Sequence, residues 1–132
     1  MKPEIEKAIQ EICASFGCHV DVQPDSEGGA FVKVPNLDIG SQYEPERSWV
    51  AFRITFQYPF ADVYPHFLVP HLRRKDGKDL TSPLHPQNQF WEPPSGREAA
   101  VMLSRRSNRR DAAVDTAALK LQRVLEWLRS QQ

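Results

Sequence analysis

The sequence predicts an α+β fold, with one helix at each end of the chain and an antiparallel sheet between the two helices. Apolar residues recur at helical spacing near both termini, and short stretches of alternating apolar and polar residues lie between them. The chain also has 11 prolines, most of them between Pro24 and Pro94. Because proline fixes its own φ and has no N–H to donate, the middle of the chain should consist of short extended segments and fixed turns. A length of 132 residues fits a single domain, residues 1–132.

The first helix is predicted for the segment that ends near Gly17. Its apolar residues are separated by steps of four, three and four, so that they form one stripe: Ile5, Ile9, Ile12 and Phe16. Glycine is the residue that most often follows a helix end, because it adopts the left-handed conformation without steric cost. We expect the apolar stripe of this helix to pack on the sheet.

Four stretches are predicted to be the strands of an antiparallel meander: residues 18–23, 30–34, 48–57 and 67–69. The third stretch is the longest, and apolar side chains occupy one of its faces: Val50, Phe52, Ile54 and Phe56. Its opposite face, which includes Trp49 and Arg53, is mixed, and we expect it to meet a helix or solvent.

The second half of the chain is predicted to hold an irregular segment and a long helix. Residues 81–96 contain four prolines and should be irregular, with Trp91 buried beneath them. Residues 99–103 form a short apolar run whose secondary structure the pattern does not decide. The last helix is predicted to begin at Asp111, which can cap it. Its apolar positions follow helical spacing: Val114, Ala117, Ala118, Leu121, Leu125 and Leu128.

Composition and charge exclude several classes of protein. The net charge is zero, so the chain as a whole has no strong attraction to nucleic acid or to anionic membranes. Residues 1–62 nevertheless hold 10 acidic and 5 basic residues, whereas residues 63–132 hold 7 acidic and 12 basic residues. No apolar run approaches the roughly 20 residues that cross a bilayer, and acids occupy the N-terminus where a signal peptide requires an apolar stretch. We therefore expect a soluble, cytoplasmic protein.

No metal site and no cofactor site is predicted. The two cysteines, Cys13 and Cys18, are too few for a disulfide framework or a four-ligand zinc site. Both follow the apolar pattern, so we do not expect either to be a nucleophile. His66 and His71 are not spaced to share one helical face, and no pattern of cysteines or carboxylates supports a metal site there.

Two motifs stand in order between the predicted elements. Residues 54–70 read ITFQYPFADVYPHFLVP, and residues 84–91 read LHPQNQFW. Together with the helix, the meander and the final helix, these motifs resemble the ubiquitin-conjugating enzyme superfamily, in a short bacterial branch. The first motif is similar to the family's strand, Tyr-Pro-Phe turn, later proline and fourth strand. The second is similar to its His-Pro-Asn signature, with one additional residue before Asn88.

The resemblance implies roles for several residues. In this family, a cysteine thiolate takes the C-terminus of a ubiquitin-like protein as a thioester, which a lysine then attacks. Asn88 matches the residue that stabilises the resulting oxyanion or orders the loop, and His85 matches a structural hydrogen-bonding residue. Ala100 best matches the position of the family's cysteine, with Ala99 as the next candidate and Ser95 as the third. An alkyl side chain cannot form a thioester.

The resemblance thus implies a component of a bacterial ubiquitin-like protein conjugation pathway. The chain would be either a thioester carrier whose cysteine is replaced by alanine here, or a naturally inactive homologue. Its partners would be a ubiquitin-like protein and an adenylating activating enzyme, which would dock on exposed residues of the first helix such as Glu6, Lys7 and Gln10. Bacterial branches of this family are associated with antiviral defence operons. The alternative is a non-catalytic binding module for a ubiquitin-like protein or a peptide.

The densest basic run of the chain contains Arg105, Arg106, Arg109 and Arg110. The simplest interpretation of this run is a solvated face. The functional alternatives are docking onto an acidic protein surface or onto the phosphates of nucleic acid. Aromatic residues are not interleaved with these arginines, so stacking on single-stranded nucleic acid is not expected.

Overall fold

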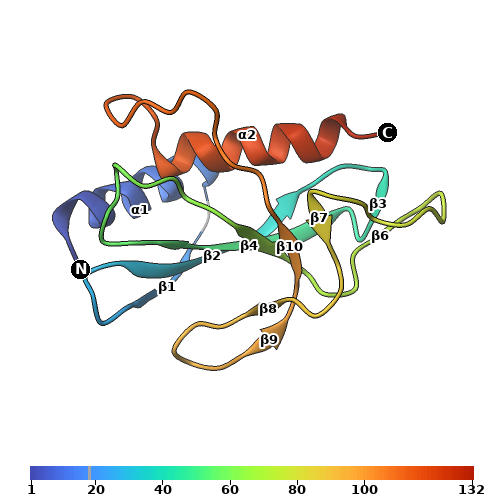
Figure 1. The fold of residues 1–132 in the computed structure, drawn as a ribbon, viewed down its shortest axis with the longest axis horizontal. Coiled ribbons are helices and arrows are strands. Elements are labelled where there is room, and N and C mark those ends of the chain that lie inside the picture. Colours follow the sequence, from blue (N-terminus) through green and yellow to red (C-terminus); the bar gives the residue numbers. More distant parts are fainter. Residues whose placement is uncertain (18) are drawn as a thin grey trace.

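The computed structural model, which describes residues 1–17 and 19–132, has a helix near each end of the chain and an antiparallel sheet formed by residues between them. Helix α1 (Pro3–Phe16) and helix α2 (Ala117–Ser130) lie together on one side of the sheet (Figure 1). The predicted α+β class, with helices at both ends and an antiparallel sheet between them, is confirmed. Neither helix has the length and hydropathy that crossing a membrane requires, which holds for the described part of the chain.

The main sheet has six strands in the order β1-β2-β4-β5-β10-β7. They are β1 (Asp21–Pro24), β2 (Ala30–Asp38), β4 (Arg47–Ile54), β5 (His66–Leu68), β10 (Val101–Leu103) and β7 (Leu84–His85). All neighbouring pairs are antiparallel. Two further pairs are separate from this sheet: β3 (Tyr43–Glu44) with β6 (Arg73–Arg74), and β8 (Phe90–Trp91) with β9 (Glu98–Ala99).

The strands differ from the predicted boundaries in ways that the local chemistry explains. β2 continues through Pro35 to Asp38, because a register shift between Val34 and Leu37 removes the proline from the ladder of hydrogen bonds. β4 ends at Ile54, and Phe56, predicted on its buried face, is exposed. β1 begins at Asp21, later than predicted, and position 18 of that prediction lies outside the described residues.

The two helices begin and end at recognisable caps. Gly17 follows α1 with a φ of 59°, and its N–H donates to the Cys13 carbonyl over 3.0 Å. The prediction that Asp111 caps the last helix is wrong. Thr116 is the cap, since its Oγ1 accepts a hydrogen bond from the Leu119 N–H at 3.1 Å. Residues 111–115 instead form a turn before the helix, which leaves Val114 exposed.

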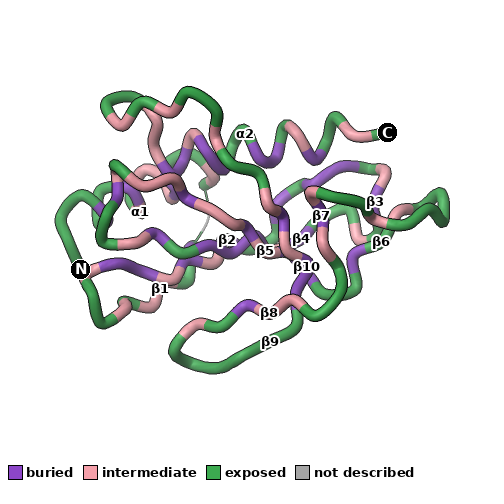
Figure 2. The backbone as a smooth tube through the Cα atoms, in the orientation of Figure 1, coloured by how far each residue is buried: buried purple, intermediate pink, exposed green. Residues whose placement is uncertain are grey.

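The core lies between the two helices and the facing side of the sheet. Figure 2 shows buried backbone along β2 and β4 and alternating burial along α2. The largest fully buried side chains in this layer are Tyr43, Phe52, Ile5, Ile12, Ile39, Ile54, Leu68, Leu103, Leu121, Leu125 and Leu128. His66 on β5 is also fully buried here, with its ring centroid 5.1 Å from that of Phe52.

The other face of the sheet is covered by the β8–β9 hairpin, which lies below the sheet in Figure 1. Trp91 of β8 packs there between Phe31 and Phe67, with ring centroids 5.7 and 5.5 Å away. The indole is buried, as predicted for a residue beneath the proline-rich segment. The mixed face of β4 therefore meets a hairpin, in the place of the helix or solvent that the sequence predicted.

Candidate functional site

The segment that carries the His-Pro signature folds back on the segment that follows it. His85 of β7 lies opposite Met102 of β10, and Phe90 of β8 lies opposite Ala99 of β9. Between these two pairs, the Ala100 N–H donates to the Gln89 carbonyl over 3.0 Å. We call residues 84–104 the signature hairpin. Of the residues that the resemblance singled out, 85–88 lie on its first arm and 99–100 lie on its second arm.

His85 has a structural partner within the signature hairpin. Its Nε2 lies 2.7 Å from the Ser104 hydroxyl oxygen, which itself donates to the Pro83 carbonyl at 3.3 Å. Since the serine proton is directed to that carbonyl, His85 is assigned as the N–H donor to Ser104. Asn88 is exposed at the turn with a φ of 57°, and its side chain makes no hydrogen bond among the described residues.

Ala99 and Ala100 point in different directions. Ala100 is 2% exposed and packs against Ala51 and Trp91 beneath the sheet. Ala99 is exposed on β9. Ser95, the third candidate, is exposed in the turn and bonded to Gln23. A group that attacks the C-terminus of another protein must be reachable from outside, so position 99 fits a nucleophile better than position 100 does.

Cysteines introduced at positions 99 and 100 are expected to react very differently with a thiol reagent. In Ala99→Cys the sulfur is exposed, so it should react at least about tenfold faster than the sulfur in Ala100→Cys. The measurement is the rate of labelling by a chromogenic disulfide under native conditions, with the parent protein as the blank for Cys13 and Cys18. Equal rates for the two variants would contradict this orientation of β9.

A groove runs between the signature hairpin and the β1–β2 edge of the sheet. It has a volume of about 460 Å³, and Phe31 and Trp91 contribute its apolar wall. Side chains tie the two sides together: Gln23 exchanges two hydrogen bonds with Ser95, at 2.8 and 2.9 Å, and Lys33 pairs with Glu98 at 2.6 Å. The hairpin is thereby held in a fixed position against the sheet.

The surface of α1 presents the residues that the resemblance assigned to partner docking. Glu6, Lys7 and Gln10 are all exposed, whereas the opposite side of the helix is buried. Beside the start of this helix, Phe56 and Phe60 form what we call the aromatic patch, where Lys2 donates to the Phe56 carbonyl at 2.8 Å. Phe60 in this patch is 82% exposed, the highest value among the large apolar residues of the described chain.

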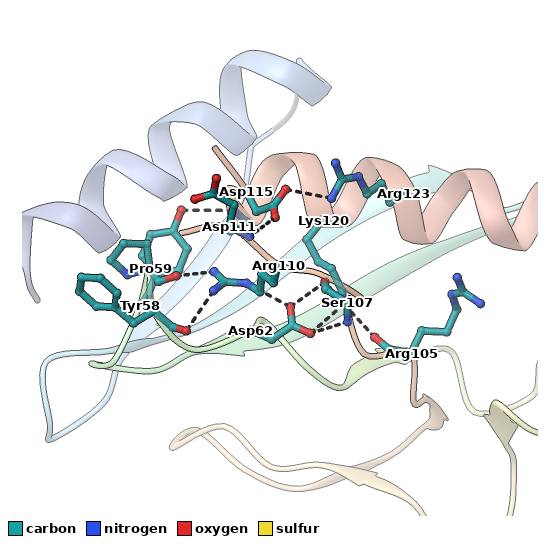
Figure 3. Close-up of polar contacts among 12 residues, drawn as sticks. Tyr58, Pro59, Asp62, Arg105, Ser107, Arg110, Asp111, Asp115, Lys120 and Arg123 are labelled. Atoms are coloured by element: carbon teal, nitrogen blue, oxygen red, sulfur yellow. Dashed lines mark hydrogen bonds and ion pairs between the residues drawn. The ribbon is translucent and has the colours of Figure 1, made fainter. Parts of the chain in front are cut away.

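An ion pair between Asp62 and Lys120 fixes residues 105–110, which we call the arginine-rich loop and which precede α2 (Figure 3). The Asp62 carboxylate accepts hydrogen bonds from the Ser107 N–H at 2.8 Å, from its hydroxyl at 3.0 Å and from Lys120 Nζ at 3.1 Å. Lys120 also donates to the Arg105 carbonyl and to the Ser107 hydroxyl, each at 2.8 Å. We call this group the Asp62 clasp; it joins the 58–62 turn, the arginine-rich loop and α2.

The charge states of the clasp follow from its hydrogen bonds. Burial raises the pKa of Asp62, but hydrogen bonds from Ser107 and Lys120 outweigh burial and hold this pKa below its ordinary value. Burial lowers the pKa of Lys120, and Asp62 opposes this effect. Lys120 Nζ donates to three acceptors, the Asp62 carboxylate, the Arg105 carbonyl and the Ser107 hydroxyl, which is the hydrogen-bonding pattern of an ammonium group beside a carboxylate.

The structure divides the predicted arginine run into two groups. Arg110 turns inward, where it lies 3.6 Å from Asp62 and donates to the carbonyls of Pro59 and Phe60. Arg105, Arg106 and Arg109 are exposed. A second basic stretch of the chain comprises Arg73, Arg74, Lys75 and Lys78. Most of its charge is balanced locally, because three of its members pair with acids: Arg73 with Glu44, Arg74 with Asp76 and Lys75 with Glu46.

Comparisons with known proteins identify no relative of the chain. Neither a protein-family model, nor a curated protein, nor a solved structure matches it. The resemblance to ubiquitin-conjugating enzymes accordingly depends on the two motifs and on the order of the elements around them.

Proposed function

We propose that this chain is a ubiquitin-conjugating-enzyme-like component of a bacterial ubiquitin-like protein conjugation pathway. One observation carries the proposal: the signature hairpin sets His85 and Asn88 on one arm and Ala99 and Ala100 on the other. This is the grouping that the family's chemistry needs, with a hydrogen-bonding residue and an oxyanion donor near the nucleophile.

The arrangement of the elements supports the same proposal. A helix comes first, then the four strands β1, β2, β4 and β5 in meander order, then a proline-rich segment, and finally a helix. This order is the one expected for a ubiquitin-conjugating fold. β10 and β7 extend the meander at the β5 edge, and the family pattern did not predict this extension.

We propose further that the chain acts in this pathway as a non-catalytic partner. Neither alanine offers a nucleophile. Ala100 is also buried against Trp91 and Ala51 beneath the sheet. If a cysteine stood at position 99, its thiolate would attack the thioester that joins the ubiquitin-like protein to the activating enzyme, form a new thioester and release the thiolate of the activating enzyme. Asn88, exposed at the neighbouring turn, is the residue that would act on the oxyanion.

The proposed docking surface for the activating enzyme combines α1 with the aromatic patch. Glu6, Lys7 and Gln10 supply polar contacts, and Phe60 supplies an apolar side chain that has almost no cover. Exposed aromatic residues of this kind commonly contribute most to the free energy of binding at an interface. Phe60→Ala is therefore expected to weaken the interaction more than Gln10→Ala.

The test uses an adenylating activating enzyme and a ubiquitin-like protein, together with ATP; the genes that neighbour the gene for this chain are the place to search for both. The parent protein is expected to bind one of them in a pull-down assay without forming an adduct. Ala99→Cys is expected to form an adduct that a thiol reductant removes, whereas Ala100→Cys should form far less of it. Binding without an adduct in any variant favours the binding-module alternative. Failure of every variant to bind either partner would overturn the proposal.

A further inference from the structure

A pocket of about 420 Å³ lies between the arginine-rich loop and α2, apart from the signature hairpin. Its volume is within the range of small-molecule sites, roughly 300–1,000 Å³. The residues that line it are mostly charged or polar: Arg105, Arg106, Ser107, Asn108, Arg109, Asp111, Val114, Asp115, Lys120, Arg123 and Val124. Five of these side chains are basic and two are acidic, so the pocket as a whole is positive.

Part of this positive charge is balanced within the protein. Lys120 pairs with Asp62 in the clasp, and Arg123 pairs with Asp115 at 3.0 Å. Arg105, Arg106 and Arg109 have no carboxylate partner among residues 1–17 and 19–132. Three guanidinium groups without a counter-charge therefore line one concavity, which leaves an excess of positive charge there.

The loop that presents these arginines is held in place before any ligand arrives. The Asp62 clasp fixes the backbone at Arg105 and Ser107. Aromatic rings support two of the guanidinium groups: Arg105 lies 4.9 Å from the ring of Trp127, and Arg106 lies 4.1 Å from that of Tyr64. Figure 3 shows that the Arg105 side chain extends away from Asp62 while its carbonyl faces Lys120. A site that is ordered before binding loses less conformational entropy when the ligand binds, which favours a higher affinity.

We infer that this pocket binds a small phosphorylated molecule with two or more phosphate charges, such as a nucleoside diphosphate. The planar fork of arginine matches two oxygens of a phosphate group at once, and it is less strongly hydrated than an ammonium group. Val114, which is 63% exposed on the wall of the pocket, offers an apolar contact for the remainder of such a ligand. The concave shape favours a small ligand over a flat acidic protein surface. This inference is independent of the proposed function.

The test measures binding of pyrophosphate and of ADP to the parent protein by calorimetry at fixed ionic strength. Saturable binding is expected for both probes. Arg106→Ala and Arg109→Ala should each weaken it by about tenfold or more, as expected for the loss of a charge-assisted hydrogen bond. Arg109 makes no hydrogen bond or ion pair through its side chain within the described chain, so its replacement should leave the melting temperature without ligand unchanged.

Arg73→Ala is the matched control, because Arg73 is an exposed arginine that pairs with Glu44 outside this pocket. It should leave the affinity for both probes unchanged. The inference is overturned if neither probe saturates at millimolar concentration, or if Arg109→Ala binds them as tightly as the parent does. It is also overturned if an oligonucleotide or a polyglutamate peptide binds while neither small probe does, since the arginines would then serve a macromolecular partner.

Discussion

Replacement of Asp62 by alanine is expected to lower the free energy of unfolding by about 3 kcal/mol, because it leaves a buried ammonium without its counter-charge. The Lys120 side chain is only 9% exposed, and Asp62 is the acidic group that it contacts, at 3.1 Å. Removal of the carboxylate also deprives the Ser107 N–H and hydroxyl of their acceptor. Denaturant unfolding monitored by circular dichroism would measure the loss.

A double-mutant cycle separates the ion pair from the other contacts of Asp62. Lys120→Met removes the buried charge and keeps much of the side-chain volume, so the double variant should lose clearly less stability than the two single losses combined. The exposed pair of Arg97 and Glu92 is the control: Glu92→Ala should cost less than about 1 kcal/mol, because solvent screens that pair. Additive losses at Asp62 and Lys120 would contradict the role given to the clasp.

The elements that the sequence predicted correctly are those whose pattern is local. The stripe of Ile5 and Ile12 and the alternation along β4 both appear within a few residues, so each predicts its own burial. β10 has three residues and no period of its own; it forms because β5 offers it a partner edge. The start of α2 also depends on a distant residue, since the Ala117 N–H donates to the Tyr58 hydroxyl at 3.2 Å.

The sequence predicted which residues belong to the candidate site, but it did not predict how they are arranged in space. The motif identified His85, Asn88 and the two alanines, but the pairing of Phe90 with Ala99 decides which alanine faces solvent. If the register of His85 with Met102 continued along the hairpin, Phe90 would lie opposite residue 97, two residues before its actual partner Ala99. Nothing in the periodicity of the sequence indicates this shift of register. In the same way, Arg110 turns inward because it pairs with Asp62, which lies far away in the sequence, whereas Arg105, Arg106 and Arg109 stay exposed.

His66 is expected to make the protein sensitive to mild acid. The imidazole is fully buried beside Phe52, and neither ring nitrogen has a hydrogen-bond partner among the described residues. Burial and, to a smaller extent, the charge of Lys120 lower the pKa of His66 to about 3, whereas the charge of Asp62 opposes the shift. In the unfolded chain, a histidine takes up its proton near pH 6.5.

The sign of the effect follows from these two pKa values. Between pH 6.5 and about 3 the unfolded chain binds a proton at His66 that the folded protein does not bind, so acid favours unfolding. The stability that comes from a neutral His66 is complete above pH 6.5 and falls by up to about 1.4 kcal/mol for each pH unit below it. Hydrogen bonds and ion pairs lower the pKa values of Asp25 and Asp62 below the ordinary carboxyl range, so these two groups contribute only below about pH 4.

Replacement of His66 by leucine isolates this effect. Leucine has a similar volume and no polar atom to desolvate, so His66→Leu should fold and should be the more stable protein at pH 5, by about 2 kcal/mol. The measurement is the free energy of unfolding in urea at several pH values between 4.5 and 7.5. The parent protein and the control His71→Gln, which changes an exposed histidine, should both lose stability across that range, whereas His66→Leu should stay nearly level. A parallel decline in all three proteins would mean that groups other than His66 cause the loss of stability in acid.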